Sequence, residues 1–236
     1  INADTRVLQA GTGFPVLLLP GFMDHIDNYI NNIEAVASYG YKVYAFDFFE
    51  HPTSNQKILN EKGLEPSLLL DQVVSFISQY SLQKVNIVGL GIGAWIALKL
   101  AILREDLVNK LVLSSVTGVK WNPELAVLDS SWSSRTLNWM LSNSPENHPF
   151  LKLINSNENL TFPPRSILTE EDLGFIKAKA LVVGSNQNEV IPVELAEHMA
   201  TLIPNTQYYC FTDPGFRASL DEQEKFNRIV GQFFMQ

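Results

Sequence analysis

The sequence predicts an α/β protein: a three-layer sandwich with a mostly parallel central sheet and a short helical cap. Short β-rich runs alternate with longer helical patterns, which is typical of a parallel sheet covered on both faces. Most of the β-rich runs are continuously hydrophobic, as expected for strands buried on both sides. The chain has 236 residues, of which 46% are hydrophobic, enough for one domain with a sizeable core.

Each predicted strand is a short apolar run followed by a polar or glycine-containing turn. The predicted strands span 15–19, 42–46, 85–88, 110–114, 180–183 and 206–211. The helical patterns between them span 28–39, 67–80, 94–102, 192–202 and 221–234. We expect strands 85–88 and 110–114 to be neighbours in one parallel sheet.

One segment interrupts this alternation. Residues 119–168 are rich in Asn, Ser and Pro and contain Trp121, Trp132 and Trp139. We interpret 119–168 as a cap inserted over the carboxyl edge of the sheet. The core domain then consists of residues 1–118 and 169–236.

Composition limits the binding partners and the cellular compartment that suit this chain. A formal net charge of -8 opposes nucleic acid as a partner, because nucleic-acid binding needs clustered Lys and Arg. The longest apolar runs are shorter than the ~20 residues of a membrane span. The single cysteine, Cys210, fits the cytoplasm or another reducing compartment. The start at Ile1 leaves room for a removed targeting segment, and the oligomeric state stays open.

The most informative motif lies between a predicted strand and a predicted helix. Gly-x-Ser-x-Gly in that context is a nucleophile elbow, a strained turn that presents the serine hydroxyl above a parallel sheet. Here the motif is Gly89-x-Gly91-x-Gly93, so the nucleophile position has no side chain.

Together these features resemble the α/β-hydrolase superfamily over nearly the whole chain. In Leu19-Pro20-Gly21-Phe22-Met23, the resemblance assigns the backbone N–H of Phe22 to the oxyanion hole. Between Gly184 and Pro192 it places Asn188 at the position of the acid, or Gln187 when counted from Gly184. In Gly215-Phe216 it places Phe216 where the family has its catalytic histidine.

The resemblance therefore implies a degenerate catalytic triad at Gly91, Asn188 and Phe216. Serine hydrolysis needs a nucleophile, a base and a group that orients the base, and all three positions carry other residue types. The N–H groups of Phe22 and Ile92 need no side chain, so they could still stabilise a carbonyl oxygen or an enolate. We predict negligible esterase activity, with Ser114 and Ser115 the first places to look for any covalent labelling.

Three residues are candidates for proton transfer. Asp24 and His25 follow the strand that carries the oxyanion loop, and Asp213 follows the last strand beside Phe216. Each has a plainer interpretation, since loop histidines are more often structural and Asp213 begins the turn Asp213-Pro214-Gly215.

The predicted ligand is a small, neutral, largely apolar molecule with one carbonyl-type acceptor. The residues predicted to contact it are Phe22, Met23, Gly91, Ile92, Trp121 and Phe216. The cap tryptophans could equally form a small core of their own. No metal is predicted, because no two histidines show metal-ligand spacing. No cofactor is predicted either: Gly89-x-Gly91-x-x-Ala94 matches the dinucleotide fingerprint, but the next strand lacks the required acidic end.

Two functions remain open on this sequence. The first is a non-hydrolytic enzyme that catalyses a cyclisation, an isomerisation or a lyase-type reaction. The second is a catalytically inactive receptor, carrier or assembly subunit on the same scaffold. A weaker third is a hydrolase with relocated residues such as Glu189 and His25. Whether the protein is an enzyme is left open.

Overall fold

The computed structural model describes residues 5–21, 24–48, 66–124, 167–188, 190–213, 215 and 217–236. Within these residues, seven strands form one sheet in the order β1-β3-β2-β4-β5-β8-β9. The strands are β1 (Val7–Ala10), β2 (Phe14–Leu19), β3 (Tyr41–Phe46), β4 (Val85–Leu90), β5 (Val108–Ser114), β8 (Lys179–Ser185) and β9 (Thr206–Phe211). All neighbours pair in parallel except β1, which is antiparallel to β3. The predicted adjacency of the strands at 85–88 and 110–114 is confirmed, because β4 pairs with β5.

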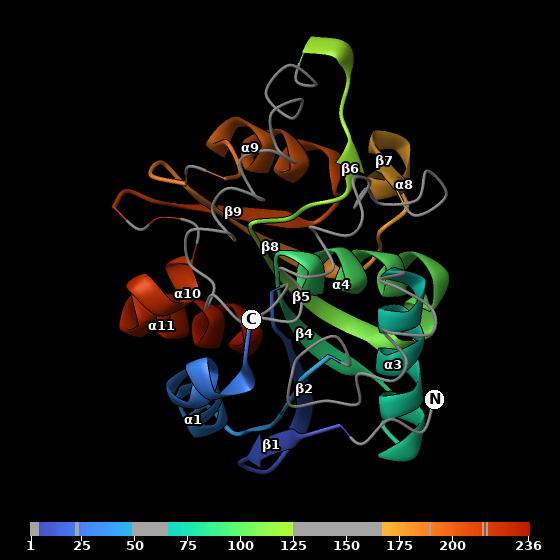
Figure 1. Ribbon diagram of the computed structural model, residues 1–236, viewed down its shortest axis with the longest axis vertical. Helices are drawn as coiled ribbons and strands as arrows, with labels where there is room; N and C mark the ends of the chain where they lie inside the picture. The colour runs from blue at the N-terminus through green and yellow to red at the C-terminus, as the bar shows by residue number, and fades with distance from the viewer. Residues whose placement is uncertain are drawn as a thin grey trace, which may run out of the picture.

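Helices cover both faces of this sheet, so the predicted three-layer α/β fold is confirmed (Figure 1). On one face lie the 3-10 helix η1 (Ile26–Tyr29), α1 (Ile30–Ser38), α10 (Ala218–Asp221) and α11 (Gln223–Met235). On the other lie α3 (Pro66–Gln79), α4 (Ile92–Leu103), α8 (Glu170–Gly174) and α9 (Val193–Leu202). The short helix η2 (Glu105–Leu107) joins α4 to β5.

Helix α4 lies against the middle of the sheet and is apolar on nearly every side. Its side chains from Ile92 to Leu98 are all buried, including Trp95 at 1% exposure. A helix that is hydrophobic all round belongs in a core. The position of α4 fixes the turn that precedes it, at the carboxyl end of β4.

Strand β1 was not predicted from the sequence. It has only four residues, Gln9 is exposed, and the strand pairs at the edge of the sheet rather than within it. Such a strand lacks the continuous apolar run of a strand buried on both faces.

A second, two-stranded sheet marks both ends of the predicted cap. β6 (Val119–Lys120) pairs in parallel with β7 (Leu168–Thr169). Thr169 then starts α8 with a capping box, because its hydroxyl accepts from the N–H of Asp172 and the Asp172 carboxylate accepts from the N–H of Thr169. Residues 125–166, with Trp132 and Trp139, lie outside the described residues, so the cap itself remains a prediction.

Candidate functional site

The turn between β4 and α4 has the geometry of a nucleophile elbow. Gly91 has φ 55° and ψ −115°, a conformation that L side chains rarely adopt. Its N–H donates to the carbonyl of Ser114 on β5 at 2.9 Å. Its own carbonyl accepts from the N–H groups of Ala94 and Trp95 at 3.1 and 3.2 Å. The turn is therefore fixed by hydrogen bonds to β5 on one side and to the first turn of α4 on the other.

The two outer glycines of the motif are required by close packing. A Cβ on Gly93 would lie 2.2 Å from the carbonyl oxygen of Leu19 on β2. A Cβ on Gly89 would lie 2.6 Å from the Cα of Ala94. Neither neighbour is the end of a flexible side chain, so the Gly-x-Gly-x-Gly spacing brings α4 directly onto the sheet.

The start of α4 offers hydrogen-bond donors at this turn. The N–H groups of Ile92 and Gly93 belong to the first turn of the helix, where such groups have no partner inside the helix. They also lie at the positive end of the helix dipole. The Ile92 side chain is buried in the core at 5% exposure.

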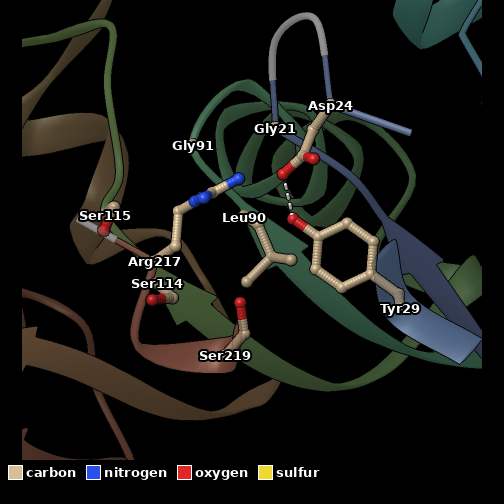
Figure 2. A pocket seen from close by; sticks show the side chains of 9 residues that line it. All are labelled: Gly21, Asp24, Tyr29, Leu90, Gly91, Ser114, Ser115, Arg217 and Ser219. Atoms are coloured by element: carbon tan, nitrogen blue, oxygen red, sulfur yellow. Dashed lines mark hydrogen bonds between the residues drawn. The ribbon is translucent and has the colours of Figure 1, made fainter. Parts of the chain in front are cut away.

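A cavity opens beside Gly91 at the carboxyl ends of the strands (Figure 2). It contains about 240 Å³ of empty space, including the open space at its mouth. It is lined by Gly21, Asp24, Tyr29, Leu90, Gly91, Ser114, Ser115, Arg217 and Ser219.

The described part of this lining carries several polar groups. It contains a carboxylate, a guanidinium, a phenol and three serines, with Leu90 as its one apolar side chain among the described residues. The apolar cleft expected from Gly91 and Phe216 stays a prediction, because Phe22, Met23 and Phe216 lie outside the described residues. A charge of each sign faces the cavity.

Asp24 and Tyr29 form one wall. The Tyr29 hydroxyl donates a short hydrogen bond to Asp24 Oδ2. Asp24 Oδ1 accepts from the N–H of His25 at 3.1 Å and from Asn28 Nδ2 at 2.7 Å. Burial, followed by the negative charge of Asp24, raises the pKa of Tyr29 well above its usual value. Tyr29 therefore stays protonated and acts as a donor to Asp24.

Arg217 and Ser219 approach from the opposite side. Figure 2 shows the Arg217 side chain extending toward Asp24 and Gly91 from the segment that leads into α10. The positive charge of Arg217 and a hydrogen bond from Ser219 both act to lower the pKa of Tyr29, against the larger effect of burial. The two walls are thus in electrostatic contact.

Asp24 lines the cavity, whereas His25 lies elsewhere. The imidazole Nδ1 of His25 is 3.5 Å from Asp27 Oδ2, and Asp27 is also bound by Arg6. His25 does not line the cavity. The loop that contains Asp24 and His25 is anchored by the fully buried Asp47, whose Oδ1 accepts from the N–H of Ile26 at 3.0 Å.

Asn188, which the sequence predicts at the position of the acid, holds its own turn through its side chain. Its Oδ1 accepts from the N–H groups of Val190 and Ile191 at 3.0 and 2.8 Å. Its Nδ2 donates to Ser115 Oγ at 3.2 Å. Ser115 lines the cavity and has φ 51°, so Asn188 stabilises an uncommon backbone conformation in the wall.

The loop at the position of the base lies beside the loop of the acid. Phe216 is outside the described residues, but Gly215 approaches Gln187, whose carbonyl oxygen would lie 3.8 Å from a Cβ on Gly215. Asp213 is exposed and does not line the cavity. Arg217, directly after Phe216, does.

Of the remaining residues predicted to contact the ligand, the structure describes only some. Phe22 and Met23 lie outside the described residues. Trp121 is in the core at 6% exposure, with its ring 6.0 Å from that of His198, and it does not line the cavity. His198 faces Glu170 with Nε2 3.3 Å from Oε1. His51 and His148 are outside the described residues.

Sequence reasoning missed Tyr29, Arg217 and Ser219. Arg217 offered one signal: it follows Gly215-Phe216, so it lies on the loop that carries the base in the family. Tyr29 and Ser219 offered none, because their approach depends on how α1 packs against α10.

Neither a metal cluster nor a membrane helix occurs in the described part of the chain. Among these residues, no group of three or more His, Cys, Asp or Glu side chains is arranged to hold a metal ion. No helix within the described ranges combines the length and apolar character needed to cross a bilayer.

Comparison with known proteins identifies a family model and relatives that match this sequence. The sequence model described as alpha/beta hydrolase fold matches residues 15–164. The chain is 24% identical over 192 residues to the 2-hydroxymuconate semialdehyde hydrolase of Pseudomonas putida, covering 71% of this chain and 68% of that one. It is 22% identical to the 2-hydroxy-6-oxononadienedioate/2-hydroxy-6-oxononatrienedioate hydrolase of Paraburkholderia xenovorans strain LB400, covering 98% and 87%.

A solved structure shows the same architecture. A variant of CumD, the meta-cleavage product hydrolase of Pseudomonas fluorescens IP01, superposes with a TM-score of 0.76 at 19% identity. The match covers 98% of this chain and 93% of that chain. At this identity the likeness describes the fold.

Proposed function

The chain belongs to the alpha/beta hydrolase fold family, and from this premise we propose that it binds a small carbonyl compound above Gly91 and acts on it without hydrolysis. The observation that carries the proposal is Gly91 itself, which has the conformation of a nucleophile elbow but no side chain that could attack. The carbonyl class is supported by the N–H of Ile92, which follows Gly91 in the first turn of α4, and by the semialdehyde and the oxo compounds in the names of two relatives.

The absence of a base supports a reaction without an acyl-enzyme. Among the described residues, no histidine lines the cavity, and Asn188 uses its side-chain oxygen within its own turn. A serine hydroxyl in this wall would therefore have no imidazole to take its proton. The weaker alternative of a relocated hydrolase would need a base other than His25, because His25 faces Asp27.

Asp24 is the candidate for proton transfer. In an isomerisation its carboxylate would take a proton from the carbon next to the carbonyl, and the electron pair of that C–H bond would move onto the carbonyl oxygen. The N–H of Ile92 would stabilise the resulting enolate oxygen. Asp24 would then return the proton to another carbon of the same system, so that atoms and charge balance. The alternative without catalysis is a receptor, carrier or assembly subunit that uses the same cavity.

Pyruvamide, a small neutral ketone, tests binding and catalysis separately. Binding above Gly91 should shift the ¹⁵N–¹H resonances of Ile92 and Gly93. Catalysis should accelerate deuterium exchange into the methyl group of pyruvamide, and Asp24→Asn should abolish that acceleration. Asp213→Asn is the matched control, because Asp213 is an exposed acid outside the cavity.

Each outcome separates the alternatives. Binding without exchange would favour the receptor or carrier. Stoichiometric labelling of the wild-type protein by a fluorophosphonate would restore a serine hydrolase and overturn the proposal.

A further inference from the structure

The end of the sheet opposite the cavity forms a face of its own. The parallel strands all begin at this edge, and the helices that precede them end there. Contacts run across it, since Phe14 is in register with Tyr41, whose ring centre lies 5.6 Å from that of Phe234. We call it the amino-end face, and it consists of residues 11–14, 39–42, 80–84, 103–110, 175–179, 203–207 and 235–236, which the structure describes.

The amino-end face is basic, although the whole chain has a formal net charge of -8. Its basic residues are Lys42, Lys84, Arg104, Lys110, Lys177 and Lys179, and its acidic residues are Glu105 and Asp106. Both acidic residues are paired, since Arg104 binds Asp106 at 2.7 Å and Lys177 binds Glu105 at 2.8 Å. The excess positive charge is carried by the other four: Lys42, Lys84, Lys110 and Lys179.

Two of these lysines lie side by side. Lys110 on β5 is in register with Lys179 on β8, and their Nζ atoms lie 6.0 and 5.7 Å from the centre of the Phe233 ring. Each ammonium donates to a neutral acceptor, Lys110 to the carbonyl of Phe234 and Lys179 to Gln236 Oε1. Burial, followed by the positive charge of Lys179, lowers the pKa of Lys110. Neutral acceptors do not compensate the two charges, so this part of the face attracts anions.

Large apolar side chains are exposed around the lysines. Among the described residues, all but one of the exposed large apolar side chains belong to the amino-end face: Phe14, Tyr80, Leu103, Phe175 and Met235. The exception is Ile30, which begins α1 at the other end of the sheet. Leu103 and Phe175 are 63% and 61% exposed, and the ion pair of Glu105 with Lys177 joins their segments. Single exposed apolar side chains are common, whereas a group of them marks a binding surface.

We infer that the amino-end face binds the surface of an anionic lipid bilayer, with its lysines at the headgroups and its apolar side chains inserted between them. The inference goes beyond the proposed function and does not depend on it. Lysines attract the protein to anionic headgroups, and the burial of large apolar side chains then holds it there. This face combines both kinds of side chain.

A second copy of the chain suits the face less well. In a symmetric dimer the same lysines would meet each other, and like charges repel. A copy packed head to tail would present the other end of the sheet, where Ile30 is the one exposed large apolar side chain among the described residues. A bilayer offers both the negative charge and the apolar interior that this face lacks.

The negative charge of the rest of the chain does not prevent this binding. A strand of six residues such as β4 spans about 20 Å from one end of the sheet to the other. The Debye length is about 8 Å at physiological ionic strength, so charges at the far end are screened over about two such lengths. The lysines nearest to the bilayer therefore dominate.

Co-sedimentation with lipid vesicles tests the inference. One set contains phosphatidylcholine with about 30% phosphatidylserine, and the other contains phosphatidylcholine alone. We expect wild type to partition onto the anionic vesicles at least about tenfold more strongly, and sodium chloride at about 0.5 M should remove this preference. Lys84→Gln should weaken partitioning about fivefold. Leu103→Ser combined with Phe175→Ser should weaken it at least about tenfold.

Two matched controls lie outside the face. Arg228→Gln removes an exposed positive charge from α11, and Ile30→Ser removes an exposed apolar side chain from α1. Both variants should partition like wild type. All the substituted side chains are exposed, and circular dichroism checks that each variant is folded.

Every other pattern of results counts against the inference. Equal partitioning onto both kinds of vesicle would remove the role of the lysines, and equal losses in the face variants and the controls would remove the role of the face. Absence of binding to anionic vesicles would exclude a bilayer and direct attention to an acidic protein partner. Each of these outcomes overturns the inference and leaves the proposed function unaffected.

Discussion

The amide of Asn32 on α1 donates a 2.9 Å hydrogen bond to the carbonyl oxygen of Ser219 on α10, 187 positions further along the chain. The same amide donates to Asn227 Oδ1 at 2.7 Å, and Asn32 Oδ1 accepts from Gln223 at 3.0 Å. Asn32 is 1% exposed, so this network is fully buried at its centre. It joins the helix that follows Tyr29 to the segment that carries Arg217 and Ser219, and so it sets the distance between the two walls of the cavity.

Asn32→Ala should therefore lower the free energy of unfolding by about 2–4 kcal/mol, because it leaves buried groups of Ser219 and Asn227, and the half-buried amide of Gln223, without their partner. Urea denaturation measures the change. The neighbouring Asn31→Ala is the control: Asn31 is exposed and bonds to Gln223 at the surface, so its loss should cost no more than about 0.5 kcal/mol. Equal losses in the two variants would contradict the role given to the network.

Gly93→Ala should be among the most damaging single changes in the chain. The new methyl would meet the carbonyl of Leu19 at 2.2 Å and push α4 off the sheet. We expect a loss of about 3 kcal/mol or more, or failure to fold, as measured by denaturation and by soluble yield. Gly174→Ala, at an exposed helix end where nothing lies within 4 Å of the new Cβ, should be neutral or slightly stabilising. A similar loss at both glycines would show that close packing is not the cause.

Alkaline pH should destabilise the protein through Tyr29. Its pKa is raised in the folded state, so folding favours the protonated phenol, and this contribution is complete below the unfolded value of 10.0. As the pH rises above 10, the unfolded chain loses its proton first and the folded state loses stability. Tyr41 and Tyr208, whose pKa values burial also raises, add to this effect.

Tyr29→Phe isolates that contribution. The variant should be less stable than wild type at about pH 8, because Asp24 loses a donor, yet it should lose less further stability between about pH 9 and pH 11. Urea denaturation at the three pH values measures both. Parallel pH curves for the two proteins would exclude Tyr29 as the source.

Gly91→Ser should not create a hydrolase. The new hydroxyl would stand at the elbow, but among the described residues no histidine lines the cavity to activate it. We expect no labelling by a fluorophosphonate and no hydrolysis of p-nitrophenyl acetate above the wild-type background. Covalent modification of the hydroxyl introduced by Gly91→Ser would reveal a base that the described wall does not show.

The fold and the elbow could be predicted from the sequence because both depend on local patterns. Strands buried on both faces read as largely apolar runs, as in β4 and β5, and Gly89, Gly91 and Gly93 mark a turn with close packing. Placing Asn188 by its distance from Pro192 led to a residue that contacts the cavity wall through Ser115. In each case a few neighbouring residues carry the information.

The cavity wall could not be predicted in the same way. Tyr29 and Arg217 are distant in the chain, and the hydrogen bond from Asn32 on α1 to Ser219 on α10 joins the segments that carry them. Reasoning from Gly91 and Phe216 considered only the residue changes at these two triad positions. It therefore predicted an apolar cleft. His25 and Asp24 are adjacent in sequence, yet one faces Asp27 and the other the cavity.

The backbone conformation of Gly91 favours glycine over serine at this position. A serine at φ 55° would hold a strained conformation at a cost of about 1–3 kcal/mol, whereas a glycine adopts it almost freely. Exchanging serine for glycine at this point is thus thermodynamically downhill, and the reverse exchange would add strain before any catalytic benefit existed. For a marginally stable protein, that asymmetry opposes a serine at position 91 unless a catalytic benefit compensates for the strain.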